Sequence, residues 1–332
     1  MMTTAPAAPA TETATGAFGH ALSPGVRRVT LDANGITLSA LLSEPAQAPP
    51  RAMVVALHGS GMTAGYFDGQ AHLAVSLLTL GASLGFTVLA IDRPGYGSSA
   101  ERLPEGQTLV EQARTVRAAL GTFAASHSSG AGIFLLAHSY GGKLAVTFAA
   151  GPDQDRGPDG GRDPRGTPNE VQQGDCPALL GLDISGCGHR YAVGPGRLPG
   201  QHGHGGVRLN WGRLGLYPPD TFRMSAGVVA PVPMREREEA ARWEHTFPDL
   251  ATRVRVPVRL TFAEHEAWWR HDDDTLTDLT GLLSASPRAL VDRLPGAGHN
   301  ISLGWVARTY HLRALAFMEE CLAVRETAAP AH

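Results

Sequence analysis

The chain has 332 residues, of which 43% are hydrophobic and 18% charged, and its formal net charge is −3. The hydrophobic fraction suffices for one substantial core, and the slightly negative charge excludes the basic field that holds nucleic acid. No run of 18 apolar residues occurs, so we expect no membrane span.

The first segment, residues 1–24, is rich in Ala, Thr and Pro and lacks the basic and apolar regions of a secretory signal. We expect it to be a disordered lead. The cysteines Cys176, Cys187 and Cys321 are widely spaced and include no CxxC pair, which favours a reducing cytoplasm. A Cys176–Cys187 disulfide is the alternative interpretation.

Two alternating segments, 26–31 and 36–42, flank Asn34-Gly35, a two-residue turn signal that predicts an antiparallel hairpin. Later apolar runs are bounded by Gly, Pro, Asp or Ser, and they predict strands buried on both faces, as in a parallel sheet. These runs are 52–57, 86–91, 133–137, 178–184, 257–262 and 289–294.

Segments with helical character lie between and after these strands. They are 69–80, 108–125, 139–150, 234–243, 273–283 and 305–324. Strands that alternate with helices imply βαβ units. We therefore predict an α/β fold with a mostly parallel central sheet, flanked by helices.

Two stretches interrupt the alternation. Residues 151–174 are dense in Gly, Pro and charge, which predicts a flexible surface loop. Residues 186–252 are rich in Gly and His at first, notably over 194–206, and later in aromatic residues and Met, which favours an inserted cap or lid. The predicted domains are a core (25–185 and 253–326), a cap (186–252) and a flexible tail (327–332).

The segment 134–142 places Ser139 where a strand turns sharply into a helix. Small residues, Ala137 and Gly141, stand two positions before and after it, and a bulky side chain at either position would clash as the chain reverses. Such a turn exposes the hydroxyl and points a helix N-terminus at developing negative charge. The usual first glycine is replaced by Ala137, and an ordinary turn with a capping serine is the competing interpretation.

Further motifs stand in a characteristic order around Ser139. His58-Gly59-Ser60-Gly61 follows one strand, residues 92–99 (DRPGYGSS) follow the next, and Gly298-His299 follows the last. With these motifs the chain resembles α/β-hydrolase-fold proteins from about residue 26 to residue 324. The resemblance implies a sheet that carries its active site on the loops after these strands.

The resemblance also implies roles for individual residues. Ser139 would be the nucleophile and His299 the base that takes its proton, because a serine hydroxyl alone is a weak nucleophile. The backbone N–H groups of Ser60 and Tyr140 would bind the tetrahedral oxyanion, with Gly61 as an alternative to Ser60.

The third member of this set is a carboxylate that orients the histidine. The family's spacing of its acid, three positions after a small residue, selects Glu266, with Ala263 in the place of glycine. Glu264 is the close competitor, and Asp183, after the preceding strand, is a third option.

Other polar motifs are interpreted as structural. His58, Asp92 and Arg93 are expected to brace loops, and His138 to pack below the turn at Ser139. Neither His202-Gly203-His204 nor the segment 271–274 offers the three or four placed ligands of a metal site, and the latter resembles a helix N-terminus. No nucleotide-binding glycine motif occurs, so we expect neither metal nor cofactor.

The predicted function is hydrolysis of a carboxylic ester or thioester of a small-molecule acyl substrate, through an acyl-enzyme. Alternatives with the same residues are an acyltransferase, a cyclising thioesterase, a C–C hydrolase and a perhydrolase. A non-catalytic ligand-binding protein is the alternative outside the enzymes. Substrate identity and oligomeric state stay open.

Overall fold

The structure is a computed structural model that describes residues 21–47, 49–151, 176–198 and 205–328. Three segments predicted to be flexible or disordered lie largely outside these residues. They are the lead 1–24 up to residue 20, the loop 151–174 beyond its first residue, and the tail 327–332 after residue 328. Residues 199–204 of the segment 194–206 also lie outside the described residues.

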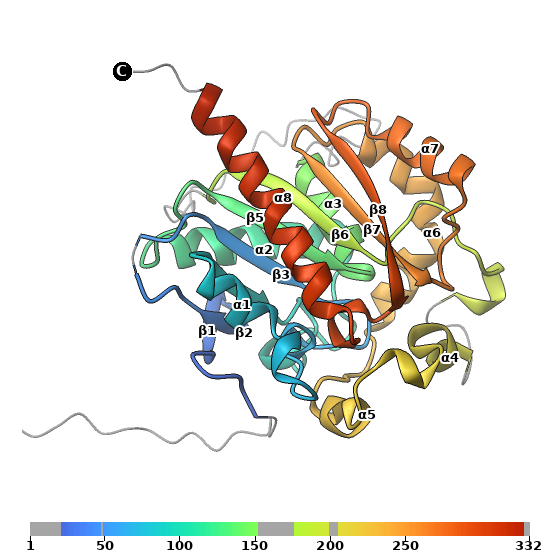
Figure 1. Cartoon of the computed structure of the whole chain (residues 1–332), viewed down its shortest axis with the longest axis horizontal. Helices are drawn as coiled ribbons and strands as arrows, with labels where there is room; N and C mark the ends of the chain where they lie inside the picture. Colours follow the sequence, from blue (N-terminus) through green and yellow to red (C-terminus); the bar gives the residue numbers. More distant parts are fainter. Residues whose placement is uncertain (1–20, 48, 152–175, 199–204, 329–332) are drawn as a thin grey trace, which may run out of the picture.

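An eight-stranded sheet forms the centre of the fold (Figure 1). Its strands are β1 (Arg27–Ala33), β2 (Ile36–Ser43), β3 (Met53–Leu57), β4 (Thr87–Ile91), β5 (Ile133–His138), β6 (Leu179–Ser185), β7 (Val258–His265) and β8 (Ala289–Gly298). They lie in the order β1-β2-β4-β3-β5-β6-β7-β8. β2 is antiparallel to β1 and β4, and the remaining pairs are parallel, which confirms the mostly parallel sheet.

Helices cover both faces of this sheet. On one face are α2 (Leu109–Ala124), α3 (Tyr140–Ala150), α6 (Met234–Ala251) and α7 (Asp273–Leu282); on the other are α1 (Leu77–Ser83) and α8 (Ala307–Ala328). Side chains of β3 alternate between the two cores, because successive residues of a strand point to opposite faces. Met53 and Val55 pack with the first set of helices, and Val54 and Ala56 with the second. The predicted burial of the central strands on both faces is confirmed.

Three helices differ from their predicted extents. α8 begins at Ala307 and ends at Ala328, whereas 305–324 was predicted. The helix expected over 69–80 begins only at Leu77, because Ser76 caps it by accepting from the Thr79 N–H (3.3 Å). The Ser76 hydroxyl also donates to Asp68 (2.6 Å), so the preceding segment is held as a loop with short 3₁₀ turns. α6 continues beyond 234–243 to Ala251, because its later residues are buried in the core.

Between β6 and β7 lie α4 (Gly205–Trp211), α5 (Thr221–Met224) and α6. Figure 1 shows α4 and α5 beyond the carboxyl end of β8, whereas α6 runs alongside the sheet. The segment is attached at both sides of the site: the Ala230 N–H donates to Gly61 O (2.9 Å), and the Trp305 N–H donates to Leu216 O (3.0 Å). The division into core and cap stays a prediction.

Two further sequence expectations concern membranes and thiols. None of the helices within the described residues is long and apolar enough to cross a membrane. Cys176, Cys187 and Cys321 are free, so the alternative Cys176–Cys187 disulfide is not formed.

Candidate active site

The site lies where the connections leave the sheet in opposite directions. β4 pairs with one side of β3 and β5 with the other, so the loops after β3 and β5 diverge and leave a crevice between them. Ser60 follows β3, Ser139 follows β5 and His299 follows β8. Because parallel strands end at the same edge, these three residues from distant parts of the chain meet there.

Ser139 occupies a strained turn between β5 and α3. Its φ of 52° and ψ of −114° lie where side-chain-bearing residues are rarely found. The Ser139 N–H donates to Ser185 O (2.8 Å), which ties the turn to β6. A Cβ atom on Gly141 would overlap the carbonyl oxygens of Leu57 and His58, so the tight turn requires glycine there.

The structure brings Ser139, His299 and Glu266 together in one hydrogen-bonded chain. His299 Nε2 lies 3.2 Å from Ser139 Oγ, and His299 Nδ1 lies 2.8 and 3.0 Å from the two Glu266 oxygens. The Trp268 N–H donates to Glu266 Oε1 (2.9 Å). His299 and Glu266 are both buried.

The protonation states within this chain follow from the contacts. Burial would raise the pKa of Glu266, but His299 and the hydrogen bonds from His299 and Trp268 hold it below its ordinary value. A carboxylate only accepts, so His299 Nδ1 donates its proton to Glu266, which leaves Nε2 as the ring nitrogen that can accept from the Ser139 hydroxyl. This is the tautomer that a general base for the serine requires.

The two alternative acids are engaged elsewhere. Glu264 is exposed and accepts from the Gly296 N–H (2.7 Å). Asp183 is fully buried, pairs with Arg259 (2.7 Å) and accepts from the Tyr310 hydroxyl (2.9 Å). Neither carboxylate is hydrogen-bonded to His299, so Glu266 is the only one of the three sequence candidates beside it.

Ser60 and Tyr140 both line the cavity beside Ser139, and their backbone N–H groups are the candidate oxyanion donors. Tyr140 is the first residue of α3, so its N–H has no partner within the helix. The Ser60 N–H donates no hydrogen bond within the described residues. The Gly61 N–H, the alternative to Ser60, is occupied by the Tyr96 hydroxyl (3.0 Å).

His58 and Arg93 hold the loop that carries Ser60. His58 Nε2 accepts from the Arg93 N–H (3.0 Å), so Nδ1 bears the proton and donates to Gly59 O (2.8 Å). Burial and the charge of Arg93 lower the pKa of His58 and keep it neutral. The Arg93 Nε–H donates to His58 O (2.7 Å). These contacts fit the bracing role predicted for both residues.

Sequence reasoning missed Glu236, which lies on α6 behind this loop. Its carboxylate forms a fully buried ion pair with Arg93 and accepts from the hydroxyls of Ser60 and Tyr96 (2.9 Å each). In the sequence, Glu236 is one of several charges in a run of Arg and Glu at a helix start, where an exposed face is the ordinary expectation. No local signal separates it from its neighbours.

His138 lies beneath the turn at Ser139, as expected. Its ring stacks on Tyr66 at 4.6 Å between centroids, and its Nδ1 lies 3.2 Å from Ser185 Oγ. Burial, together with the nearby His299, lowers the pKa of His138, so the ring is neutral. His138 also lines the cavity beside Ser139.

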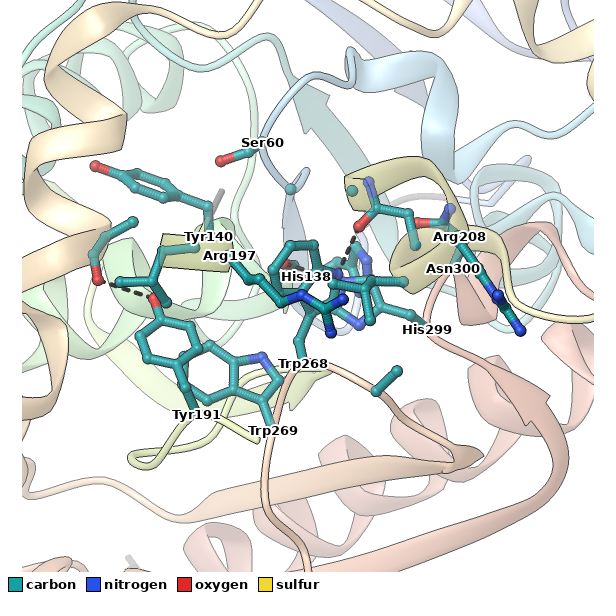
Figure 2. Close-up of a pocket in the computed structure, with 18 of the residues that line it drawn as sticks. Ser60, His138, Tyr140, Tyr191, Arg197, Arg208, Trp268, Trp269, His299 and Asn300 are labelled. Carbon is teal, nitrogen blue, oxygen red and sulfur yellow. Dashed lines mark hydrogen bonds between the residues drawn. The ribbon is translucent and has the colours of Figure 1, made fainter. Parts of the chain in front are cut away.

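A cavity of about 1140 Å³ opens beside Ser139 and His299. Figure 2 shows Tyr140, Tyr191, Trp268 and Trp269 among its lining side chains. Trp268 and Trp269 are also buried in the core, so they serve both as anchors and as pocket walls. The Tyr140 hydroxyl is buried without a hydrogen-bond partner among the described residues.

The sequence predicted no metal site. Within the described residues no group of three or more His, Cys, Asp or Glu is placed to hold a metal ion. His202 and His204 lie outside those residues. Asp272 is the N-cap of α7 and accepts from the Thr275 N–H (3.0 Å), which confirms the interpretation of 271–274 as a helix start.

An eight-stranded α/β sheet with a serine at a strained strand-to-helix turn defines the α/β-hydrolase class. The sequence profile of the alpha/beta hydrolase family matches residues 54–309, so the chain belongs to this family. A comparison with curated protein sequences finds no significant match.

Solved structures of hydrolases share the fold. A thermostable carboxyl esterase from Bacillus coagulans matches with a TM-score of 0.61 at 14% identity, over 90% of this chain and all 100% of its own. A lipase in its open form matches with a TM-score of 0.60 at 15% identity, over 90% of this chain and 99% of its own. An N-acyl homoserine lactonase complexed with N-hexanoyl homoserine matches with a TM-score of 0.58 at 14% identity, over 92% of this chain and 99% of its own. At these identities the likeness concerns the fold.

Proposed function

We propose that the protein is a serine hydrolase that cleaves a carboxylic ester or thioester through an acyl-enzyme. The observation that carries the proposal is the hydrogen-bonded chain from Ser139 Oγ through His299 to Glu266, at a turn whose strain exposes the serine. The esterase, lipase and lactonase among the similar structures act on ester bonds by their names, which favours this chemistry within the family.

In the first half-reaction Ser139 Oγ attacks the carbonyl carbon while His299 Nε2 takes the hydroxyl proton. Glu266 holds the ring and stabilises the imidazolium that forms. The negative charge that develops on the carbonyl oxygen is met by the N–H groups of Ser60 and Tyr140, and such donors are worth about 10²–10³ in rate each. His299 then protonates the leaving group as the tetrahedral intermediate collapses to the acyl-enzyme.

In the second half-reaction water attacks the acyl-enzyme, and His299 takes its proton. Ser139 leaves with that proton, and the free acid is released. An acyltransferase or a cyclising thioesterase would admit an alcohol or amine in place of water, and a C–C hydrolase or perhydrolase would use the same three residues on other bonds. A cytoplasmic location and the lack of a nucleic-acid partner stay predictions from the cysteines and the net charge.

The test is covalent labelling with a fluorophosphonate, followed by hydrolysis of 4-nitrophenyl acyl esters and matched acyl thioesters. We expect labelling and turnover in the unaltered protein, loss of both in Ser139→Ala, and retention of both in Ser128→Ala, which alters an exposed serine. Folded protein that neither labels nor turns over an ester or thioester would be a ligand-binding protein. If turnover rises steeply with an added alcohol or amine and the acylated alcohol or amine is the product, the protein would be an acyltransferase instead of a hydrolase.

A further inference from the structure

A lysine lies on the pocket wall, one helical turn after the candidate nucleophile. Lys143 is four residues beyond Ser139 on α3, lines the same cavity and is only 2% exposed. No step of the proposed reaction uses it. A charged side chain is buried only at a considerable cost in free energy unless a partner compensates for the lost water.

Aromatic rings surround the Lys143 ammonium group. Its Nζ lies 5.0–5.6 Å from the ring centroids of Tyr191, Trp269, Trp243 and Tyr140. Nζ donates to the Tyr191 hydroxyl, which in turn donates to Ala240 O (2.9 Å). Ring faces stabilise a cation, but they do not neutralise it. Two of the three ammonium protons have no acceptor among the described residues.

The nearby carboxylates are committed to other partners. Glu236 pairs with Arg93. Glu244 accepts from the Tyr191 N–H (2.6 Å), and Glu239 accepts from the Leu109 N–H (3.4 Å). Lys143 forms no ion pair within the part of the chain that the structure describes. Lys143 therefore lines the cavity without a direct ion pair, and these carboxylates act on its charge only from a distance.

The mouth of the cavity is also positive. Four exposed arginines line it, and none of them makes an ion pair within the described residues: Arg197, Arg208, Arg213 and Arg237. No Asp or Glu is among the described residues that line the cavity. Figure 2 shows Arg197 and Arg208 among the side chains that line the pocket with Trp268 and His299. The cavity is thus a cationic region in a chain whose net charge is −3.

We propose that the substrate carries a carboxylate, that Lys143 binds this group inside the pocket, and that the arginines at the mouth draw it in. This inference rests on the proposed function and adds the substrate class: the ester or thioester of a molecule with an additional free carboxylate. The buried ammonium supplies two charge-assisted hydrogen bonds in a water-poor site, where they are strongest. The exposed arginines act mainly through their field, which attracts anions and is screened by salt.

The experiment compares two pairs of esters, each differing in one carboxylate. Mono-4-nitrophenyl adipate is paired with 4-nitrophenyl hexanoate, which has an acyl chain of equal length, and 4-carboxyphenyl hexanoate is paired with 4-carbamoylphenyl hexanoate, whose leaving group is neutral and of similar reactivity. We expect kcat/KM for one of the two charged esters to exceed that of its neutral counterpart by about tenfold or more at low salt. Salt should reduce this ratio, and the charged ester that is preferred identifies the half of the substrate that Lys143 contacts.

Variants assign the preference to Lys143. In Lys143→Met, which keeps the length and apolar stem, the ratio of kcat/KM values should fall about tenfold or more. In Arg208→Gln/Arg213→Gln, which alters exposed residues and does not threaten the fold, the ratio and its salt dependence should both decrease. Arg308→Gln, an exposed change on α8 outside the cavity, removes one charge and should leave the ratio unchanged.

A binding measurement keeps the inference testable apart from turnover. Adipate should protect Ser139 from fluorophosphonate labelling at lower concentration than hexanamide, and this difference should vanish in Lys143→Met. Equal or better turnover of the neutral ester, with no protection by adipate, overturns the inference while the hydrolase proposal stands. A preference that persists in folded Lys143→Met overturns the role of Lys143. Failure to label Ser139 and to turn over any ester overturns the proposed function itself.

Discussion

Glu236 on α6 and Arg93 after β4, separated by 143 positions in the sequence, form an ion pair in which both side chains are fully buried. The same carboxylate accepts from the Ser60 hydroxyl, and the same guanidinium donates to the carbonyl oxygens of His58 and Gly59. The pair therefore connects the segment between β6 and β7 to the loop whose N–H is proposed to bind the oxyanion.

Replacing Glu236 by Gln should impair both stability and turnover. The substitution leaves the Arg93 charge buried and unpaired, which costs about 3 kcal/mol of unfolding free energy. The loop that carries Ser60 loses its support, so kcat should fall by about tenfold while KM changes less. Denaturant unfolding and steady-state kinetics measure these effects. Glu238→Gln, an exposed change on the same helix, is the control. Unchanged unfolding of Glu236→Gln would show that the pair contributes nothing.

The assignment of the acid predicts distinct outcomes for three carboxylates. Glu266→Gln should lower kcat by on the order of 10³–10⁴, because the amide favours the wrong tautomer of His299. Glu264→Gln should retain turnover, since this exposed carboxylate only accepts from a backbone N–H.

Asp183→Asn should act on stability rather than on chemistry, because it deprives the buried guanidinium of Arg259 of one of its two carboxylates. Kinetics at a temperature where each variant is folded separate the outcomes. A large loss of kcat in folded Asp183→Asn with near-normal turnover in Glu266→Gln would move the acid to Asp183.

The tight turn at Ser139 predicts opposite effects of one substitution at two helical glycines. Gly141→Ala should destabilise the protein by about 1–3 kcal/mol, because the added methyl overlaps the carbonyl oxygens of Leu57 and His58. Gly281→Ala adds the same methyl on α7 in open space and should stabilise by about 0.5–1 kcal/mol. The denaturant midpoints of the two variants measure both changes in stability. Equal shifts of the midpoint in Gly141→Ala and Gly281→Ala would mean that the turn at Ser139 relaxes easily.

The inferred carboxylate preference should depend on pH. Burial lowers the pKa of Lys143 to about 8, so the ammonium is present at neutral pH and is lost as the pH rises through that value. The ratio of kcat/KM for the charged and neutral esters should fall over the same range, because a neutral amine binds carboxylate weakly. Taking the ratio cancels every pH dependence that the two esters have in common. A ratio that is constant through pH 8 would contradict this titration.

The other titratable groups around Lys143 do not reproduce that profile. They are Tyr140, Tyr191, Cys187, Glu236, Glu239 and Glu244. Burial raises the pKa of both tyrosines and of Cys187, so these groups stay neutral near pH 8. Lys143→Met, which retains all of them, should show a constant ratio across the same pH range.

The α/β fold, the strands and the positions of Ser139 and His299 were accessible from the sequence, whereas Glu266 was only one of three candidate acids. Apolar runs and helical patterns are local signals, and the turn at Ser139 requires small neighbours within a few residues. Helix ends were less accessible, as the late start of α1 shows, because the Ser76–Asp68 hydrogen bond that fixes it belongs to the tertiary structure.

The sequence by itself determined the order of the strands along the chain and the residue types available at their ends, because backbone preference and hydrophobic period act locally. Only the tertiary structure decided which carboxylate meets His299, which charges are neutralised and which are left facing the cavity. In the sequence, nothing distinguishes Glu236 and Lys143 from other charged residues of helices. Packing placed Glu236 against Arg93. It left Lys143 beside the pocket without an ion pair to a carboxylate among the described residues. Sequence patterns do not show these outcomes, because burial and pairing depend on residues far apart in the chain.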